Sequence, residues 1–177
     1  YKGIWPWESL MRVPFVWRAP DGVASPEGSQ QVVSLLDFAP TVLDYAGVDP
    51  EVLNMRKPAD SDAGPKSEWP GLPGRSLRSL IDAGIALPQR PAICEYDEDW
   101  KSPRMVRRRT IVTKRWKLSV FPKLGDGLLI DLREDPHETR NLWGDADYAG
   151  VQSRLTAQLL EELVWSDRLA GPRICGA

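Results

Sequence analysis

The sequence predicts an α/β chain whose terminal part is of the α+β class. A nearly continuous apolar run at residues 10–18 is typical of a strand buried on both faces, and an amphipathic pattern at residues 35–46 predicts a helix. After residue 90, four short apolar segments separated by turn residues predict an antiparallel sheet. The long periodic segment at residues 148–169 predicts a helix that covers one face of this sheet.

Composition narrows the possible partners. The chain has 177 residues with 23 basic and 25 acidic side chains, so its net charge favours neither nucleic acid nor a membrane surface as partner. No apolar run approaches the roughly 20 residues that span a bilayer. Cys94 and Cys175 allow at most one disulfide and show no zinc-binding spacing. The compartment stays open. Because the chain begins at Tyr1 in the middle of a motif, we expect an upstream part.

The first part of the chain reads as the end of a larger layered domain. The strand at residues 10–18 would need neighbours that the chain does not clearly supply, so we expect them upstream. Residues 31–34 are a second, short strand candidate. In the helix at residues 35–46, Pro40 places the regular start near Asp37, and Gly47 suits the stop. The apolar face expected to be buried consists of Leu35, Leu36, Ala39, Val42, Leu43 and Ala46.

A Pro- and Gly-rich segment at residues 49–74 leads to a second, shorter helix. Ser76 is the candidate N-cap of this helix, and Leu80 and Ile81 are its candidate buried residues.

The terminal part reads as a four-stranded meander followed by a helix. Strands are predicted at residues 92–96, 106–113, 116–121 and 128–132, with a tight turn at Lys114-Arg115. The helix at residues 148–169 carries an apolar stripe that would pack on the sheet. This stripe consists of Val151, Leu155, Leu159 and Leu163, widened by Leu160 and Val164.

Five motifs occur in a fixed order. They are Lys2-Gly3, Trp7-Glu8 and Arg12-Val13-Pro14; Ser34 to Thr41 with Asp44 to Gly47; Gly74-Arg75-Ser76-Leu77; Arg109-Thr110 with Trp116-Lys117-Leu118; and the closing stretch from Gly127 to Leu142, with its Asp135-Pro136 turn. In this order they resemble the sulfatase family. The closing stretch is the most specific match, although Ile130 stands where the family usually has an aromatic residue.

The resemblance implies a fold and a reaction. Sulfatases have an α/β domain like that of alkaline phosphatase, followed by a smaller domain with a four-stranded antiparallel sheet and a terminal helix. Residues 1–83 would then be the last strand and helices of the first domain, and residues 90–177 the terminal subdomain. Family members hydrolyse sulfate esters with a formylglycine nucleophile and a calcium ion, so the partner would be a sulfated small molecule or a sulfated sugar.

Of the family's active site, only Lys2 can be carried over to this chain. In sulfatases the lysine of this loop binds the sulfate and stabilises the leaving group, which suits a compact ammonium with three donors. The Cys/Ser-x-Pro-x-Arg motif that becomes formylglycine is absent, and so are the family's calcium-binding aspartates. We therefore expect no metal site in this chain and no activity from it alone.

Other residues have competing interpretations. Glu8 and Arg12 are read as a structural ion pair. The basic run from Lys101 to Lys117 is read either as a groove for a sulfated substrate or as strand residues paired with the acids at 95–99; nucleic-acid binding is the weaker alternative. His137 is read as a surface turn residue. Trp5, Trp7 and Trp100 line a sugar pocket or pack in the core, and Trp100 is the best pocket candidate.

Three functions compete at this point. The first is the C-terminal portion of a sulfatase. The second is a phosphonate monoester or phosphodiester hydrolase of the same superfamily, which shares the lysine loop and the terminal domain. The third is a non-catalytic binding module that uses the tryptophans and the arginine run.

Overall fold

The computed structural model describes residues 5–18, 29–48, 74–97, 106–122 and 124–166. These residues fall into two compact units. The sheet unit takes in residues 1–17, 29–32 and 88–161, and the helical unit takes in residues 18–28, 33–87 and 162–177. Each unit is described by itself.

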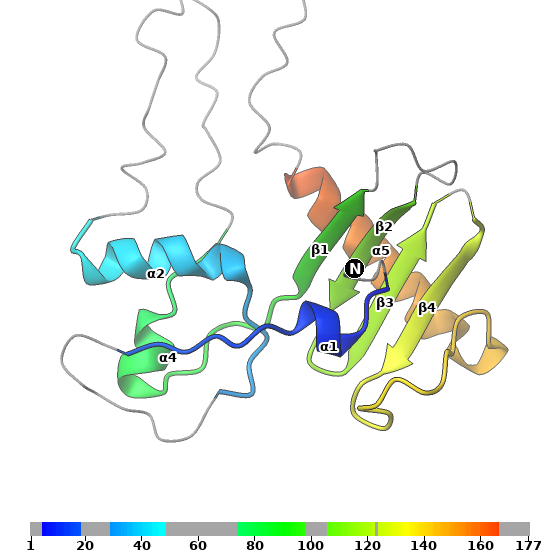
Figure 1. Cartoon of the computed structure of the whole chain (residues 1–177), viewed down its shortest axis with the longest axis horizontal. Helices are drawn as coiled ribbons and strands as arrows, with labels where there is room; N and C mark the ends of the chain where they lie inside the picture. Colours follow the sequence, from blue (N-terminus) through cyan, green and yellow to red (C-terminus); the bar gives the residue numbers. More distant parts are fainter. Residues whose placement is uncertain (1–4, 19–28, 49–73, 98–105, 123, 167–177) are drawn as a thin grey trace, which may run out of the picture. The chain divides into compact units, whose positions relative to one another are not determined.

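The sheet unit is built on the predicted meander. Strands β1 (Ala92–Asp97), β2 (Arg107–Val112), β3 (Trp116–Phe121) and β4 (Asp126–Asp131) lie side by side in sequence order, and every neighbouring pair is antiparallel. The four-stranded antiparallel sheet expected for the terminal part is therefore confirmed (Figure 1). The bounds agree within two residues because turn residues punctuate each strand.

The two faces of the sheet differ in chemistry. Ile111, Leu118 and Leu129 face one another across three strands and are fully buried. The 3-10 turn η2 (Ala146–Tyr148) and helix α5 (Ala149–Ser166) follow the sheet, and α5 lies along one of its faces (Figure 1). Strand residues alternate between faces, so Lys117 points to the opposite face. That face carries buried polar side chains, namely Arg108, Thr110, Lys117 and Ser119.

A short N-terminal helix lies on the other side of the sheet from α5 (Figure 1). Helix α1 (Glu8–Met11) is one turn long, and its N-cap Trp7 makes no side-chain capping bond. Isolated helices of this length are not stable in water, so its contacts with the rest of the sheet unit hold it.

The closing motif protects the outer edge of β4. The Asn141 side-chain amide donates to the Gly127 carbonyl and accepts from the Leu129 N–H, both at 3.0 Å. A side chain at Gly127 would come within 2.4 Å of the Trp143 ring, which explains why a glycine stands there. The Asn141 side chain thus binds two backbone groups on a strand edge that would otherwise be open.

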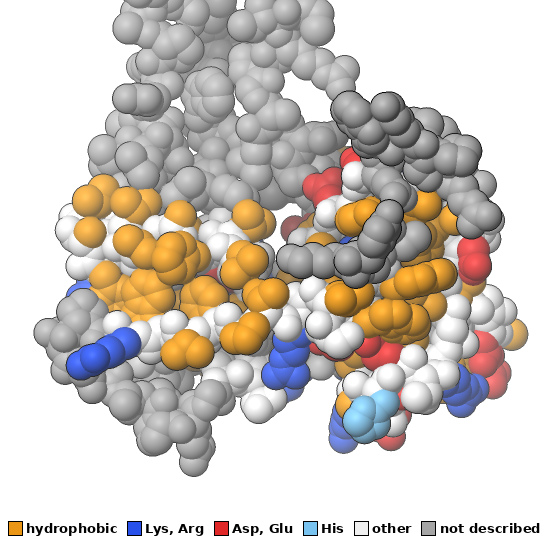
Figure 2. All heavy atoms as spheres, viewed as in Figure 1, with side chains coloured by type: hydrophobic (Ala, Val, Ile, Leu, Met, Phe, Trp, Pro, Cys, Tyr) orange, Lys and Arg blue, Asp and Glu red, His pale blue; other side chains and the backbone are white. Residues whose placement is uncertain are grey.

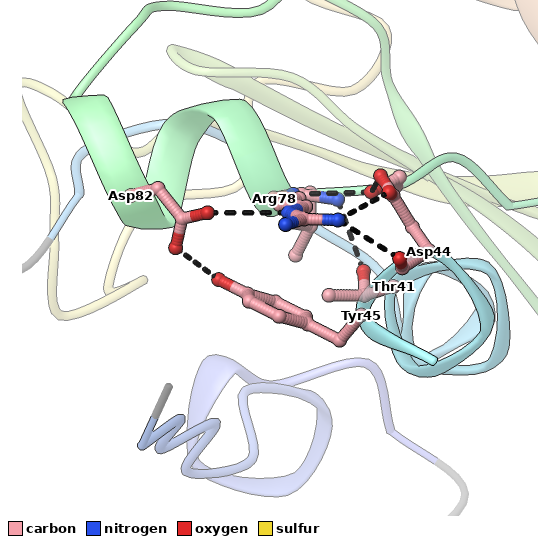
Figure 3. A network of polar contacts seen from close by, with 7 residues as sticks. Thr41, Asp44, Tyr45, Arg78 and Asp82 are labelled. Carbon is pink, nitrogen blue, oxygen red and sulfur yellow. Dashed lines mark hydrogen bonds and ion pairs between the residues drawn. The ribbon is translucent and has the colours of Figure 1, made fainter. Parts of the chain in front are cut away.

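The helical unit consists of η1 (Leu35–Asp37), α2 (Phe38–Tyr45) and α4 (Arg78–Ala83). Ser34 and Asp37 form a capping box at the start, and Gly47 ends the helical segment with φ +71°. The helical prediction for residues 35–46 is confirmed. Figure 3 shows how α2 and α4 are joined: Arg78 of α4 contacts Asp44 of α2 at 3.2 Å, and the Tyr45 hydroxyl of α2 donates to Asp82 of α4.

Buried polar groups complete this unit. The Asp37 carboxylate accepts backbone N–H bonds from Ser34 and Arg75, and the Leu77 N–H donates to Thr41 at 3.0 Å. Asp37 and Thr41 are buried because they satisfy backbone donors that water cannot reach.

Two predicted strands are wrong. Residues 8–11 are helical and residues 12–18 have no regular structure, and Val16 is 92% exposed. Residues 31–34 form no strand either. An apolar run becomes a strand only where a neighbouring backbone accepts its hydrogen bonds, and within the described residues no strand pairs with either segment.

The side-chain burial predicted for two helices also needs correction. The face of residues 35–46 that was expected inside is largely outside: Leu35 is 64% and Val42 40% exposed, whereas Pro40 and Thr41 are buried. The residues that face inward there are Pro40 and two polar residues that bind backbone N–H groups, Asp37 and Thr41. Leu160 and Val164 do not widen the α5 stripe, since they are exposed.

The start of α4 is also different from the prediction. Its N-cap is Leu77 rather than Ser76, although the Ser76 hydroxyl still accepts from the Arg78 N–H at 3.1 Å. Leu80 and Ile81 are only half-buried, and Leu77, at 2% exposure, is the buried residue.

Candidate functional site

The two residues predicted to touch substrate, Lys2 and Trp100, lie outside the described residues. The structure does describe the segment that follows Lys2. Trp5 stacks against Trp7 with ring centroids 6.2 Å apart and meets Phe121 edge-on at 5.8 Å. Trp7 also packs on a small buried cluster of Val106, Phe121 and Leu128. Trp7 therefore packs on the core of the sheet unit.

A buried ion network holds the next residue of this segment. The Lys117 ammonium, on β3, contacts the Glu8 carboxylate at 3.2 Å and the Glu138 carboxylate at hydrogen-bond distance. Glu138 also accepts the backbone N–H of Glu8 at 2.6 Å. The Lys117 side chain is completely buried, and that of Glu138 is 6% exposed. Three of the motifs recognised in the sequence thus meet at one point.

The predicted ion pair between Glu8 and Arg12 is wrong. The Glu8 carboxylate contacts Lys117, and Arg12 is linked to Glu8 only through its backbone N–H, which donates to the Glu8 carbonyl at 2.8 Å. Glu8 pairs with Lys117 rather than Arg12 because the buried Lys117 ammonium needs carboxylate partners.

The backbone at Glu138 is unusual. Glu138 is the only non-glycine residue among those described with positive φ, at +56°. A side chain in this left-handed region costs roughly 1–2 kcal/mol. The turn around it is fixed by Asp135, which accepts from the Arg140 backbone N–H at 2.8 Å and from the Thr139 hydroxyl at 3.1 Å. The strain is offset by the contacts that Glu138 makes with Lys117 and Glu8.

The energetics of the network depend on complete pairing. Burial lowers the pKa of Lys117 from its ordinary value, and the nearby Glu8 carboxylate opposes this change. Removing one partner of a buried ion pair typically costs about 3–5 kcal/mol because it leaves an uncompensated charge. The Glu8–Lys117–Glu138 network therefore acts as one unit.

An open depression of about 400 Å³ lies beside the network. Its lining residues come from the α1 region and the closing turn, and they are Trp7, Glu8, Ser9, Pro136, His137 and Glu138. His137 is exposed in the Asp-Pro turn, as predicted.

Two members of the basic run, Arg109 and Arg115, form ion pairs with acidic residues of neighbouring strands. Arg109 contacts Glu95 at 2.8 Å and Asp97 at 2.7 Å. Arg115 contacts Asp131 at 2.7 Å. The interpretation in which strand arginines pair with the preceding acids is confirmed for Arg109. Lys101 and Arg104, the first members of the run, lie outside the described residues.

The described residues do not fit a metal centre. No three His, Cys, Asp or Glu side chains come together as ligands in the part of the chain that the structure describes. Cys94 is a free, half-buried thiol. A calcium ion needs six or more oxygen ligands converging from a rigid scaffold, and this donor set lacks them.

Comparisons with known proteins agree with the motifs. Residues 68–164 match the family described as N-sulphoglucosamine sulphohydrolase, C-terminal. An N-acetylglucosamine-6-O-sulfatase of Bacteroides thetaiotaomicron is 29% identical over 160 residues, which are 88% of this chain and 25% of the relative. The chain thus spans about a quarter of that relative's length.

Solved structures give the same picture. The structure of BT4656 in complex with its substrate D-glucosamine-2-N,6-O-disulfate has 26% identity and a TM-score of 0.53, over 77% of this chain and 24% of that one. A phosphonate monoester hydrolase of Agrobacterium radiobacter has 25% identity and a TM-score of 0.56, over 76% and 25%.

The residues that match the family model include the four-stranded sheet, the closing turn and most of α5. The chain belongs to the N-sulphoglucosamine sulphohydrolase C-terminal family, since the match covers more than half of it. No helix in the described residues is both long and apolar enough to cross a membrane.

From the sequence, Lys117 is interpreted only as a member of the basic run and of a family motif, and Glu138 only as part of the closing stretch. One signal could have found Lys117: a lysine inside a strand whose other residues are all apolar or small. Such a lysine needs a buried acidic partner.

Proposed function

We propose that this chain is the C-terminal portion of a sulfatase that hydrolyses sulfate esters of a glucosamine-type sugar. The observation that carries the proposal is the family match over residues 68–164, together with the motif that places Lys2 six residues before Glu8. In this proposal residues 1–83 complete the α/β catalytic domain and residues 90–177 form the terminal subdomain.

The substrate class is supported by the relatives. The family name, the curated relative and one solved complex all refer to sulfated glucosamines. A second candidate, phosphonate monoester hydrolysis, is supported by the Agrobacterium radiobacter structure at similar identity. Both chemistries need a cation near the transferred oxyanion, so Lys2 suits either one. Trp100 is the proposed residue for stacking on a sugar ring.

The chemistry of Lys2 follows from its side chain. An ammonium donates to the oxygens of a bound sulfate and stabilises charge on the leaving oxygen. In the full-length enzyme we propose that upstream residues supply the formylglycine nucleophile and the divalent metal, which the family resemblance implies. The described residues do not supply these groups, so this chain by itself should be inactive.

Two assays test the proposal. The chain of residues 1–177 should show no hydrolysis of an aryl sulfate or of glucosamine 6-sulfate. In the intact enzyme, Lys2→Ala should lower turnover by roughly two to three powers of ten, which is typical for loss of one transition-state donor. Phenylphosphonate monoesters in the same assay separate the second candidate. Full activity of Lys2→Ala, or turnover by the chain alone, would overturn the assignment.

A further inference from the structure

We propose that Lys117 is a positioning residue: clamped between Glu8 and Glu138, it fixes the segment that follows Lys2 in the sequence, residues 5–11, onto the terminal sheet. This inference rests on the proposed function, in which Lys2 binds the sulfate. It assigns to the terminal sheet a part in the reaction beyond support of the fold.

The network joins residues that are far apart in the sequence. Lys117 and Glu8 are separated by 109 residues, and Glu138 and Glu8 by 130. The network thus joins the closing turn and the sheet to the segment that begins six residues after Lys2. Its bonds reach this segment through both the Glu8 carboxylate and the Glu8 backbone N–H.

Helix α1 cannot be stable without contacts to the rest of the sheet unit. Helix α1 has four residues and no side-chain cap. Two sets of contacts place it: the aromatic packing of Trp5 and Trp7, and the ion network at Glu8. Aromatic packing tolerates small rotations of the segment. The Glu8 N–H donates to the Glu138 carboxylate, and the Glu8 carboxylate accepts from the Lys117 ammonium, so the two bonds together fix the position and direction of Glu8.

The clamp also depends on charge. Two carboxylates surround one ammonium, and Arg108 adds positive charge from β2, where it opposes protonation of Lys117. Neutralising one group weakens the clamp without removing the apolar stem of Lys117 from the sheet.

A positioning role and a purely structural role predict different results. If Lys117 acts only on stability, its replacement should lower the melting temperature but leave the catalytic constants of the folded enzyme unchanged. If it acts through Lys2, replacement should lower kcat more than it raises KM. The effect should also vanish when Lys2 is absent, because groups that act as a unit are not additive.

The experiment is a double-mutant cycle in the intact enzyme. Lys117→Met and Glu8→Gln are each expected to lower kcat/KM for glucosamine 6-sulfate by 10- to 100-fold. In a Lys2→Ala background, the same changes should lower it by less than 2-fold. Glu8→Gln is included because it keeps a polar side chain of the same size at a position that is 26% exposed, so it should disturb the fold less than Lys117→Met.

Arg115→Met is the matched control. Arg115 is a basic residue in the turn before β3 with its own buried carboxylate partner, Asp131, and its described ion pair does not involve residues 5–11. Its replacement should lower the melting temperature and leave kcat/KM within 2-fold. Lys117→Arg, which keeps the charge, should restore part of the activity.

The outcomes separate the two claims. An unimpaired Lys2→Ala enzyme overturns the proposed role of Lys2 and this inference with it. An impaired Lys2→Ala enzyme, combined with silent or fully additive Glu8→Gln and Lys117→Met, overturns the positioning role alone.

Discussion

Asp131 ends β4, and its carboxylate accepts five hydrogen bonds from N–H groups of three residues. Its carboxylate accepts two bonds from the Arg115 Nε and Nη2 atoms, at 3.0 and 2.7 Å to one oxygen, and weaker bonds from the Arg133 and Glu134 backbone N–H groups. Arg115 is the main reason that the pKa of Asp131 lies below its ordinary value of 3.8. The charged form of Asp131 is therefore the one that the fold prefers.

This preference predicts a pH-dependent contribution to stability. A carboxylate with a depressed folded-state pKa stabilises the protein above its unfolded-state pKa, near 3.8, and the contribution is lost as the pH falls through the lower folded value. Asp131→Asn should therefore lower the melting temperature at pH 7, and the difference from wild type should shrink below about pH 4. Thermal melts of wild type and Asp131→Asn at pH 7 and at pH 3 measure this difference.

Glu134→Gln is the control for Asp131→Asn. Its side chain is 70% exposed and its distance to Arg133 is 3.9 Å, so its removal should change little at either pH. An equal loss for Asp131→Asn at pH 7 and at pH 3 would contradict the ionic role of Asp131.

At the scale of the element, α5 shows how one face of a helix is selected. Leu155 and Leu159 are buried at 2% and 3% exposure, whereas Leu160 is 62% exposed. Residues four apart lie on the same face of a helix, and a neighbour one position along lies about 100° away. The stripe that meets the sheet is therefore narrow.

The predicted consequence is a sharp contrast between two leucines of the same helix. Leu155→Asp should destabilise the protein by several kcal/mol, since it buries a charge without a partner. Leu160→Asp, on the exposed face of the same helix, should change the free energy of unfolding by less than about 0.5 kcal/mol. Urea unfolding measures both. Similar losses for the two variants would show that α5 is not packed as described.

The elements that the sequence predicted well share a physical property. Strands β1 to β4 pair with sequence neighbours, so local alternation and turn residues suffice to locate them. The segment at residues 10–18 was misread because an apolar run does not reveal whether a backbone partner exists. The contacts of Lys117 and Glu138 with Glu8 could not be predicted for a similar reason. The tertiary fold brings these residues together, and their spacing in the sequence does not indicate it.

At the scale of the whole molecule, the helical unit carries a large exposed apolar surface. Figure 2 shows hydrophobic side chains gathered over α2 and α4. The residues that form this apolar surface are Leu35, Leu36, Phe38, Val42, Val48 and Ile85, with exposures from 38% to 64%. Contiguous apolar surface of this kind marks an interaction face. In the proposed sulfatase, the upstream domain would cover it, since the relatives are about four times longer.

The isolated chain should therefore associate with itself as its concentration rises. Static light scattering of residues 1–177 should show a mass that increases with concentration, and Phe38→Ser with Val42→Asp should suppress the increase. Leu124→Ser, which changes an apolar residue that is 62% exposed outside this surface, should have no such effect. A monodisperse monomer at all concentrations would show that this surface needs no cover.

The ion network around Lys117 also sets an order of events during synthesis. The segment with Trp7 and Glu8 leaves the ribosome first, but its anchor at Glu138 is made 130 residues later. At about 5–20 residues per second, this segment waits roughly 7 to 26 seconds for its partner. A chain interrupted before the closing turn lacks both Glu138 and the Asn141 cover of β4. Synthesis of the closing turn thus decides when the segment with Trp7 and Glu8 can make its final contacts.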